Sequence, residues 1–266
     1  MKIFCISVFN KDYNKLKNLN LIPVGLGKKK FSKNWLSDKG KKNISKKNPN
    51  FGEYTFHFKL WKNKKVYLDY NNWIGFCTYR RFWTNSSKLK INNYKELEKI
   101  IIKKPLTHWK NYDVILGRPL IFKRVKVIKL IKQNIIEIFK KPNVLYKDLS
   151  LEDQFRIFHG SFFLDKAIEL MPPKYQKDFK IYINGHKFYP YNMFICRDFK
   201  ILLKFYNEIF PWLFKCEKAF KSKNLTGYGK IRIYGFLAER FMPFWFMKNF
   251  RVKTCNISFF DKKIIK

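Results

Sequence analysis

Two arginines that follow a tyrosine are the residues of this chain whose types best suit anion binding. Arg80 and Arg81 come directly after Tyr79, at the end of the apolar run 74–78. A guanidinium group stays charged at physiological pH and binds phosphate oxygens through two parallel hydrogen bonds. We therefore predict that both arginines contact a diphosphate group, although one of them could instead form an ion pair with a carboxylate. Tyr79 could stack on a base or a sugar, or it could form part of the core.

A polar block lies upstream of these arginines and leads into a predicted helix. Asn43, Ser45 and Asn48 carry short polar side chains, and the proline after Asn48 is tolerated in the first turn of a helix. Backbone amides at a helix N-terminus bind phosphate, so the block is predicted to hold ribose hydroxyls or phosphate. Turn and cap chemistry favours the same residue types and is the simpler account of Asn48 taken alone. Glu53 stands three residues after Asn50, as in a capping box, and could otherwise bind a sugar hydroxyl or act as a base.

A glutamate and an arginine adjoin each other in an aromatic helical segment of the second half. Glu239 and Arg240 lie among apolar residues of the segment 233–247. Buried charges need a partner or a function, so these side chains are predicted to pair with each other or with Arg232. Glu239 is also a candidate catalytic carboxylate, and Arg240 a candidate sugar-binding residue.

Three further polar residues of the second half are candidates for binding an acceptor sugar. His186 and Asn192 are predicted to lie on a loop and at a strand edge. A histidine can act as a general base near neutral pH, although a histidine in a loop is more often simply solvated. Asp153 is the third candidate, and the start of a helix after Ser150 accounts for a carboxylate there equally well.

The elements that position these residues alternate between strand and helix in the first half of the chain. Apolar runs predict strands over 2–9, 21–26, 74–78 and 113–116, with helices over 48–61 and 94–103. Helical spacing covers 125–139, 151–170, 199–220 and 233–247, with short strands at 187–189, 193–196 and 252–254. Alternation of strand and helix is typical of a parallel sheet. We therefore expect one α/β domain spanning 1–266, with a mainly parallel central sheet in the N-terminal half and a helix-rich C-terminal half packed on it.

The composition fits a globular domain with a strongly basic surface. The 266 residues are 46% hydrophobic, which is enough to bury a full core, and the formal net charge is +38. Such a charge is typical of proteins that bind nucleic acid or an anionic membrane. A genomic bias toward A- or T-rich codons, which raises the lysine content without selection for charge, explains it as well. The lysines are spread along the whole chain without a nucleic-acid-binding motif, which argues against nucleic acid as the partner. An anionic membrane surface would attract each nearby lysine by about 1 kcal/mol, and flotation with anionic rather than neutral liposomes would test this partner.

The cysteines and the apolar segments bear on the compartment. The five cysteines are widely spaced within apolar runs and form no C-x-x-C pair, so we predict buried reduced thiols and no structural zinc site. The apolar N-terminus is too short for a signal peptide, and no apolar segment is long enough to span a bilayer. These features predict a cytoplasmic protein.

Five blocks of the sequence carry a resemblance to a known family, namely 43–53, 61–63, 74–82, 191–195 and 232–240. In this order and at this spacing they resemble the family catalogued as domain of unknown function 4422, over nearly the whole chain. Members of that family are associated with capsular polysaccharide and O-antigen synthesis and are regarded as glycosyltransferases with a GT-A-like fold. The chain departs from the family pattern at Thr78, where the family usually has histidine, and at Asn10, where it usually has the histidine of a His-Lys pair.

The resemblance implies a GT-A-like enzyme that transfers a hexose from a nucleoside diphosphate sugar, with a UDP-sugar favoured. The acceptor that it implies is a hydroxyl of a surface polysaccharide or of a lipid-linked glycan, used in the cytoplasm or at the inner face of a membrane. The catalytic residues that it implies are Arg80, Arg81, Glu53 and Glu239. It also places Lys11 in the nucleotide-sugar site, because this residue matches the lysine of the family's His-Lys pair.

Metal dependence is left open by the sequence. Many GT-A enzymes bind Mn²⁺ or Mg²⁺ through an Asp-x-Asp element, and this chain has none. Single carboxylates could bind such an ion through water and the diphosphate. Arginines and backbone amides could instead take its place, which is the alternative that we favour.

Two other classes of function remain open. A basic module could bind nucleic acid or another anionic polymer without catalysis, and its affinity would then fall steeply with ionic strength. A degenerate transferase could serve a structural role, an alternative that Thr78 and Asn10 raise. Hydrolysis of a donor sugar in the absence of acceptor would argue against the degenerate transferase.

Overall fold

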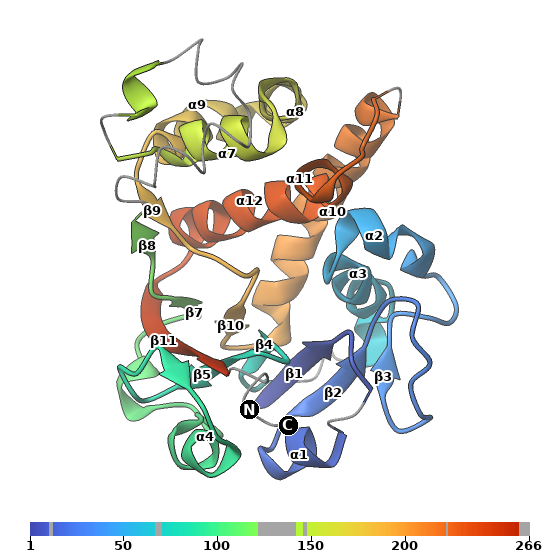
Figure 1. The fold of residues 1–266 in the computed structure, drawn as a ribbon, viewed down its shortest axis with the longest axis vertical. Coiled ribbons are helices and arrows are strands. Elements are labelled where there is room, and N and C mark those ends of the chain that lie inside the picture. The colour runs from blue at the N-terminus through green and yellow to red at the C-terminus, as the bar shows by residue number, and fades with distance from the viewer. Residues whose placement is uncertain (11–12, 67–70, 122–141, 146–147, 222, 261–266) are drawn as a thin grey trace.

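The first four strands run parallel to one another. The computed structural model, which describes residues 1–10, 13–66, 71–121, 142–145, 148–221 and 223–260, places them in the order β3-β2-β1-β4 (Figure 1). Their bounds are β1 (Lys2–Ser7), β2 (Ile22–Gly25), β3 (Leu36–Ser37) and β4 (Ile74–Thr78). Strands β1, β2 and β4 coincide with apolar runs, because a strand that is covered on both faces needs apolar residues at successive positions. The predicted helix over 125–139 lies outside the described residues.

The sheet then closes on itself into a mixed barrel of five strands. β4 pairs antiparallel with β5 (Arg81–Thr84) and with β10 (Phe194–Cys196). β11 (Val252–Phe260) lies between β5, to which it is antiparallel, and β7 (Val114–Gly117), to which it is parallel. The ring is completed by the antiparallel pairing of β7 with β10. Most pairings in this ring are antiparallel, so the expectation of a GT-A-like, mainly parallel central sheet is wrong.

The prediction fails because the direction of a strand depends on partners that lie far away in the sequence. β10 and β11 belong to the helix-rich half, and both return to the sheet that the first half begins. β11 also extends over nine residues, whereas its sequence predicts only 252–254. Its buried residues are Cys255, Ser258 and Phe260, separated by half-buried or exposed positions, so it lacks the continuous apolar run that marks β1 and β4.

The helices differ greatly in length. They are α1 (Tyr13–Asn18), α2 (Asn48–Phe51), α3 (Tyr54–Lys62), α4 (Tyr94–Ile100), α7 (Leu151–His159), α8 (Ser161–Glu169), α9 (Pro173–Ile183), α10 (Phe199–Phe220), α11 (Tyr228–Ile231) and α12 (Ile233–Asn249). Single turns of 3-10 helix are η1 (Ser45–Lys47), η2 (Lys64–Val66), η3 (Thr107–Trp109) and η4 (Pro142–Leu145). Outside the ring, β6 (Lys90–Ile91) pairs with β11, and β8 (Leu120–Ile121) pairs with β9 (Lys187–Phe188). None of the helices in the described ranges is both long and apolar enough to cross a membrane.

Two long helices separate the sheet from an outer layer of helices. α10 and α12 cross next to the barrel, and α7, α8 and α9 pack on their far side (Figure 1). An aromatic core joins α3, α10 and α12 to one face of the sheet through residues such as Phe56, Phe205 and Phe241. A second cluster covers the other face, where α1 and α4 contribute Leu16 and Leu97. All five cysteines are buried free thiols, as the sequence predicts.

A histidine is sealed inside the aromatic core. The side chain of His57, on α3, is fully buried, and its ring centroid lies 4.2 Å from that of Phe76. Its Nδ1 atom is 2.7 Å from the hydroxyl oxygen of Tyr206, and its Nε2 atom has no hydrogen-bond partner in the described part of the chain. Burial lowers the pKa of His57 to about 3, so the imidazole is neutral at physiological pH.

This buried histidine makes stability depend on pH. The pKa of His57 is lower in the folded chain than its ordinary value of 6.5, so below pH 6.5 the unfolded state takes up a proton that the folded state does not. We expect the free energy of unfolding to fall by on the order of 1 kcal/mol for each pH unit below that value, until the pH nears the folded pKa. Urea unfolding at a series of pH values, compared between the wild type and His57→Phe, measures this contribution. A His57→Phe variant that loses stability in acid as steeply as the wild type would contradict it.

Candidate active site

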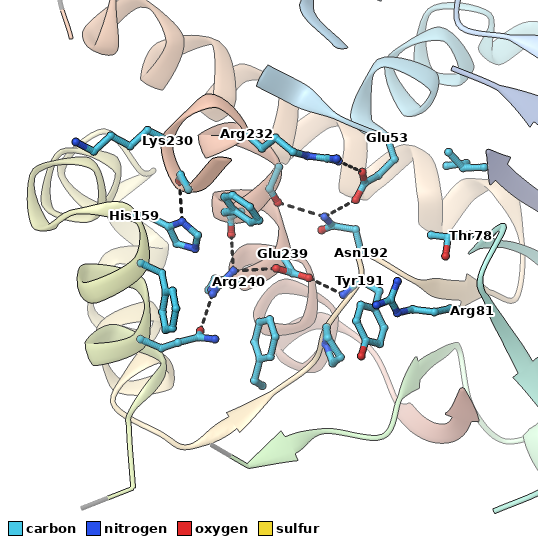
Figure 2. A pocket seen from close by; sticks show the side chains of 18 of the residues that line it. Glu53, Thr78, Arg81, His159, Tyr191, Asn192, Lys230, Arg232, Glu239 and Arg240 are labelled. Atoms are coloured by element: carbon cyan, nitrogen blue, oxygen red, sulfur yellow. Dashed lines mark hydrogen bonds and ion pairs between the residues drawn. The ribbon is translucent and has the colours of Figure 1, made fainter. Parts of the chain in front are cut away.

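A cavity of about 980 Å³ opens between the carboxyl ends of two parallel strands and the helices that face them. One side is formed by Ile6, on β1, and Thr78, on β4, and the other side by α7, α11 and α12 (Figure 2). Parallel strands present their carboxyl ends at one edge of a sheet, where α/β proteins commonly bind ligands. The cavity is lined by six of the residues that the sequence predicts for the site, namely Glu53, Tyr79, Arg81, Asn192, Glu239 and Arg240.

Arg81 reaches this cavity. Tyr79 and Arg80 form a two-residue turn between β4 and β5, so that Thr78 pairs with Arg81. The Cζ atom of Arg81 lies 3.9 Å from the ring centroid of Tyr191. No carboxylate within the described ranges pairs with Arg81, so its positive charge faces the cavity without compensation.

The neighbouring arginine does not line the cavity. The Cζ atom of Arg80 lies 4.7 Å from the ring centroid of Phe259, on β11. The Nε atom of Arg80 is buried and has no hydrogen-bond partner among the described residues. The Cζ atom of Arg81 also lies 5.4 Å from the Phe259 ring centroid, but only Arg81 lines the cavity, so adjacency in the sequence does not bring both guanidinium groups to one site. The expected pair of guanidinium groups is therefore divided between the cavity and the barrel.

Glu53 connects two of the sequence blocks. Its Oε2 atom accepts a hydrogen bond of 2.9 Å from Nη2 of Arg232, and its Oε1 atom accepts one of 2.7 Å from Nδ2 of Asn192. The preceding residue, Gly52, has a φ of 56°, and a Cβ atom there would lie only 2.3 Å from Nη2 of Arg232. Glycine permits both the backbone angle and the close approach. The predicted capping box with Asn50 is not formed, because Gly52 ends α2 and Glu53 directly precedes α3.

Glu239 and Arg240 form a buried ion pair that also contacts two other elements. Oε1 of Glu239 accepts a hydrogen bond of 2.5 Å from the backbone nitrogen of Tyr191, and Oε2 lies 2.9 Å from Nη1 of Arg240. Nη2 of Arg240 donates to Oε1 of Gln154, on α7, at 2.6 Å. The Arg240 side chain is only 3% exposed. Burial raises the pKa of Glu239, and the adjacent guanidinium opposes this rise.

Two consecutive residues adopt a left-handed backbone between these contacts. Tyr191 and Asn192 have φ angles of 81° and 51°, which cost free energy in residues other than glycine. Glu239 binds the Tyr191 amide and Glu53 binds the Asn192 side chain, so the two carboxylates hold the turn from both sides (Figure 2). Strained backbone that buried groups hold in place is common at functional sites. The sequence does not single out Tyr191, although it lies within the block 191–195.

A histidine that the sequence patterns did not reveal lines the other side of the cavity. His159 ends α7, and its Nδ1 atom lies 2.8 Å from the carbonyl oxygen of Gly229. Its ring stacks on that of Phe236 at a centroid distance of 4.1 Å. Burial and then the charge of Arg240 lower the pKa of His159 to about 3, so the ring is neutral. It directly precedes Gly160, and glycine commonly follows the end of a helix, so this glycine within the predicted helical segment 151–170 is the signal that could have drawn attention to it.

The polar block upstream of Glu53 satisfies its own hydrogen bonds. Oδ1 of Asn43 accepts hydrogen bonds from the backbone nitrogen and the hydroxyl group of Ser45. Nδ2 of Asn48 donates to a carbonyl and a hydroxyl group at the start of α3. These are the turn and cap contacts that such residues favour, and none of the three side chains lines the cavity.

Two other predicted residues lie away from the cavity, and a third is not among the residues that the structure describes. Asp153 closes a capping box with Ser150 at the start of α7, which is the structural alternative that its position suggested. His186 lies in the loop before β9 and does not line the cavity. Lys11 falls outside the described residues.

The carboxylates of the cavity are already paired. Glu53 and Glu239 each form an ion pair with an arginine. Across the part of the chain that the structure describes, no group of three or more His, Cys, Asp or Glu side chains is placed to hold a metal ion. The Thr78 hydroxyl, at the position where the resembled family has histidine, is buried and has no hydrogen-bond partner among the described residues.

Both the fold and the sequence of this chain resemble known proteins. The chain is similar to part of the apo structure of the bifunctional glycosyltransferase WbbM, with a TM-score of 0.69 and 21% sequence identity, over 98% of this chain and 45% of that one. The chain thus spans less than half the length of WbbM, and at this identity the likeness shows a shared fold. No curated protein matches the sequence. Residues 2–250 match the domain of unknown function DUF4422, and the chain therefore belongs to that family.

Proposed function

We propose that the chain is a glycosyltransferase that moves a hexose from a nucleoside diphosphate sugar, with a UDP-sugar favoured, to a hydroxyl group of a surface-polysaccharide acceptor. The observation that carries this proposal is the guanidinium of Arg81, which faces a cavity of about 980 Å³ with no carboxylate partner in the described ranges. A cavity of this size has room for a sugar nucleotide and part of an acceptor. Membership of the DUF4422 family and the fold shared with WbbM support the same class of activity.

The charges in the cavity suit an anionic leaving group at the end where Arg81 lies. The two carboxylates of the cavity neutralise Arg232 and Arg240, and Lys230 lines the cavity on the side opposite Arg81 (Figure 2). As the bond between sugar and diphosphate breaks, negative charge grows on the diphosphate, and a guanidinium that is already in place stabilises it. Arg81 is therefore the proposed diphosphate ligand, and the strand ends beside it are the proposed nucleoside site.

Glu239 is the proposed general base. Burial raises its pKa, which makes this carboxylate a better proton acceptor than an exposed one. The acceptor hydroxyl would give its proton to Glu239 while its oxygen bonds to the sugar carbon and the diphosphate leaves. Glu53 and Asn192 hold the turn that sets Tyr191 beside Arg81, and so they are proposed to position the reacting groups.

Thermal unfolding with a panel of UDP- and GDP-sugars tests the donor. We expect the preferred UDP-sugar to raise the melting temperature by about 5 °C when it is present at roughly 100 times its Kd. The shift should persist in EDTA, because Arg81 is proposed to take the place of a cation. Slow hydrolysis of the same sugar nucleotide without acceptor would exclude a degenerate transferase. A panel that leaves the melting temperature unchanged would refute the proposal, and steeply salt-dependent binding of a polyanion would then favour the binding module.

A further inference from the structure

The cavity has a second polar end, away from Arg81. His159 and Arg81 lie on opposite sides of Figure 2, with Glu239 between them. The end near His159 is formed by α7, by the segment 226–230 and by Phe236. The side chains that α7 presents at this end are uncharged, whereas Arg81 brings a positive charge to the end beside the strands.

The partner of His159 determines which ring nitrogen carries the proton. A carbonyl oxygen only accepts hydrogen bonds, so Nδ1 of His159 must donate to the Gly229 carbonyl, 2.8 Å away. Because the pKa of His159 is about 3, the ring is neutral and its Nε2 atom carries a lone pair. Nε2 has no hydrogen-bond partner among the described residues, and it remains accessible from the cavity.

Arg240 fixes the orientation of the Gln154 amide, as Gly229 fixes the proton of His159. A guanidinium only donates hydrogen bonds, so the amide oxygen of Gln154 must face Nη2 of Arg240, at 2.6 Å. The amide nitrogen then has two N–H groups that find no acceptor in the described part of the chain, and Gln154 lines the cavity. α7 thus presents one fixed hydrogen-bond acceptor and one fixed donor, both without charge.

We propose that His159 and Gln154 form the subsite for the acceptor sugar, in which Nε2 of His159 accepts a hydrogen bond from one hydroxyl and the Gln154 amide donates to another. Sugar hydroxyls both donate and accept, so an uncharged acceptor and an uncharged donor on one helix match two hydroxyls of one ring. Phe236, on which His159 stacks, adds an apolar surface for the C–H face of the sugar. This assignment rests on the proposed transferase function, in which the donor sugar nucleotide binds at the Arg81 end of the cavity.

Two substitutions at one position separate contact with the ligand from a structural role. His159→Asn places an amide nitrogen near Nδ1 and keeps the bond to Gly229, but it removes the acceptor at Nε2. His159→Gln places an amide near Nε2 and keeps an acceptor there, but it gives up the bond to Gly229. Binding of the octyl glycosides of glucose, galactose and mannose to the UDP-saturated protein is measured by saturation-transfer NMR. We expect His159→Asn to bind the preferred glycoside about tenfold more weakly, and His159→Gln to bind it nearly as well as the wild type.

A variant at the second residue covers the case in which changes at His159 disturb the fold. Gln154→Glu keeps an oxygen toward Arg240 but cannot donate, so it should weaken binding of the same glycoside by about tenfold. The assignment is overturned if UDP binds and none of the glycosides does, or if His159→Asn binds as tightly as the wild type. It is also overturned if only His159→Gln loses binding, because the histidine would then serve only to hold the segment 226–230. Failure of the wild type to bind UDP would instead refute the proposed function.

Discussion

Replacement of Arg81 by alanine should lower kcat/KM for the nucleoside diphosphate sugar by about 100-fold or more, with much of the loss in kcat. The guanidinium lies in the cavity without a carboxylate partner among the described residues, so nothing else beside the strand ends would take over its charge. Initial rates of donor hydrolysis and of transfer, measured over a range of donor concentrations, give the two constants. Arg81→Lys keeps the charge but loses the bidentate geometry, so it should recover part of the activity.

Arg80 supplies the matched control for this experiment. It is the same residue type at the adjacent position, but it contacts Phe259 and does not line the cavity. Arg80→Ala should therefore leave kcat/KM within a few-fold of the wild type. Equal losses in the two alanine variants would support the paired clamp that the sequence suggests, and full activity in Arg81→Ala would place the diphosphate elsewhere.

Glu239→Gln should both destabilise the fold and abolish transfer. The substitution keeps the shape of the side chain but removes the charge that faces Arg240, whose side chain is 3% exposed. An unpaired buried charge costs about 3 kcal/mol or more of stability. The variant also loses the proposed base, so the rate of transfer should fall below detection while UDP still binds. Urea unfolding measures the first effect, and transfer assays well below the unfolding midpoint measure the second.

Removal of both charges separates the two effects. Glu239→Leu combined with Arg240→Met leaves no unpaired charge, so the double variant should regain most of the stability that the single variant loses. It should not regain activity. A Glu239→Gln variant that unfolds like the wild type would show that the ion pair is unimportant for stability. Transfer by the stable double variant would show that Glu239 is not the base.

Some features of the site follow from local sequence, because an unusual residue stands out among its neighbours. Arg81 follows the turn that ends the apolar strand β4, and it lines the cavity. Glu239 and Arg240 lie in an aromatic helix, where burial of a charge requires a partner, and the predicted pairing is confirmed at 2.9 Å. Such inferences need only the residues on either side and the physical cost of burying charge.

Other features depend on contacts between segments that are distant in sequence. The spacing of Asn50 and Glu53 predicts a capping box, but the Glu53 carboxylate instead binds Asn192 and Arg232 from the second half of the chain. His159 belongs to a helix that carries none of the resembled blocks, so no local pattern connects it to the site. The barrel could not be predicted for the same reason. Strand pairing depends on two segments, whereas a local sequence pattern describes only one of them.

Because β11 closes the barrel, the barrel can fold only after β11 has been synthesised. The hydroxyl groups of Thr84 and Ser258, which form a hydrogen bond between β5 and β11, are 174 residues apart. Until β11 leaves the ribosome, β5 and β7 expose backbone groups that can recruit other chains. Pairing at such long range gives a high contact order and slow folding. We therefore expect the nascent chain to depend on chaperones until β11 is released, and persistent protease sensitivity of ribosome-arrested chains that lack β11 would report this dependence.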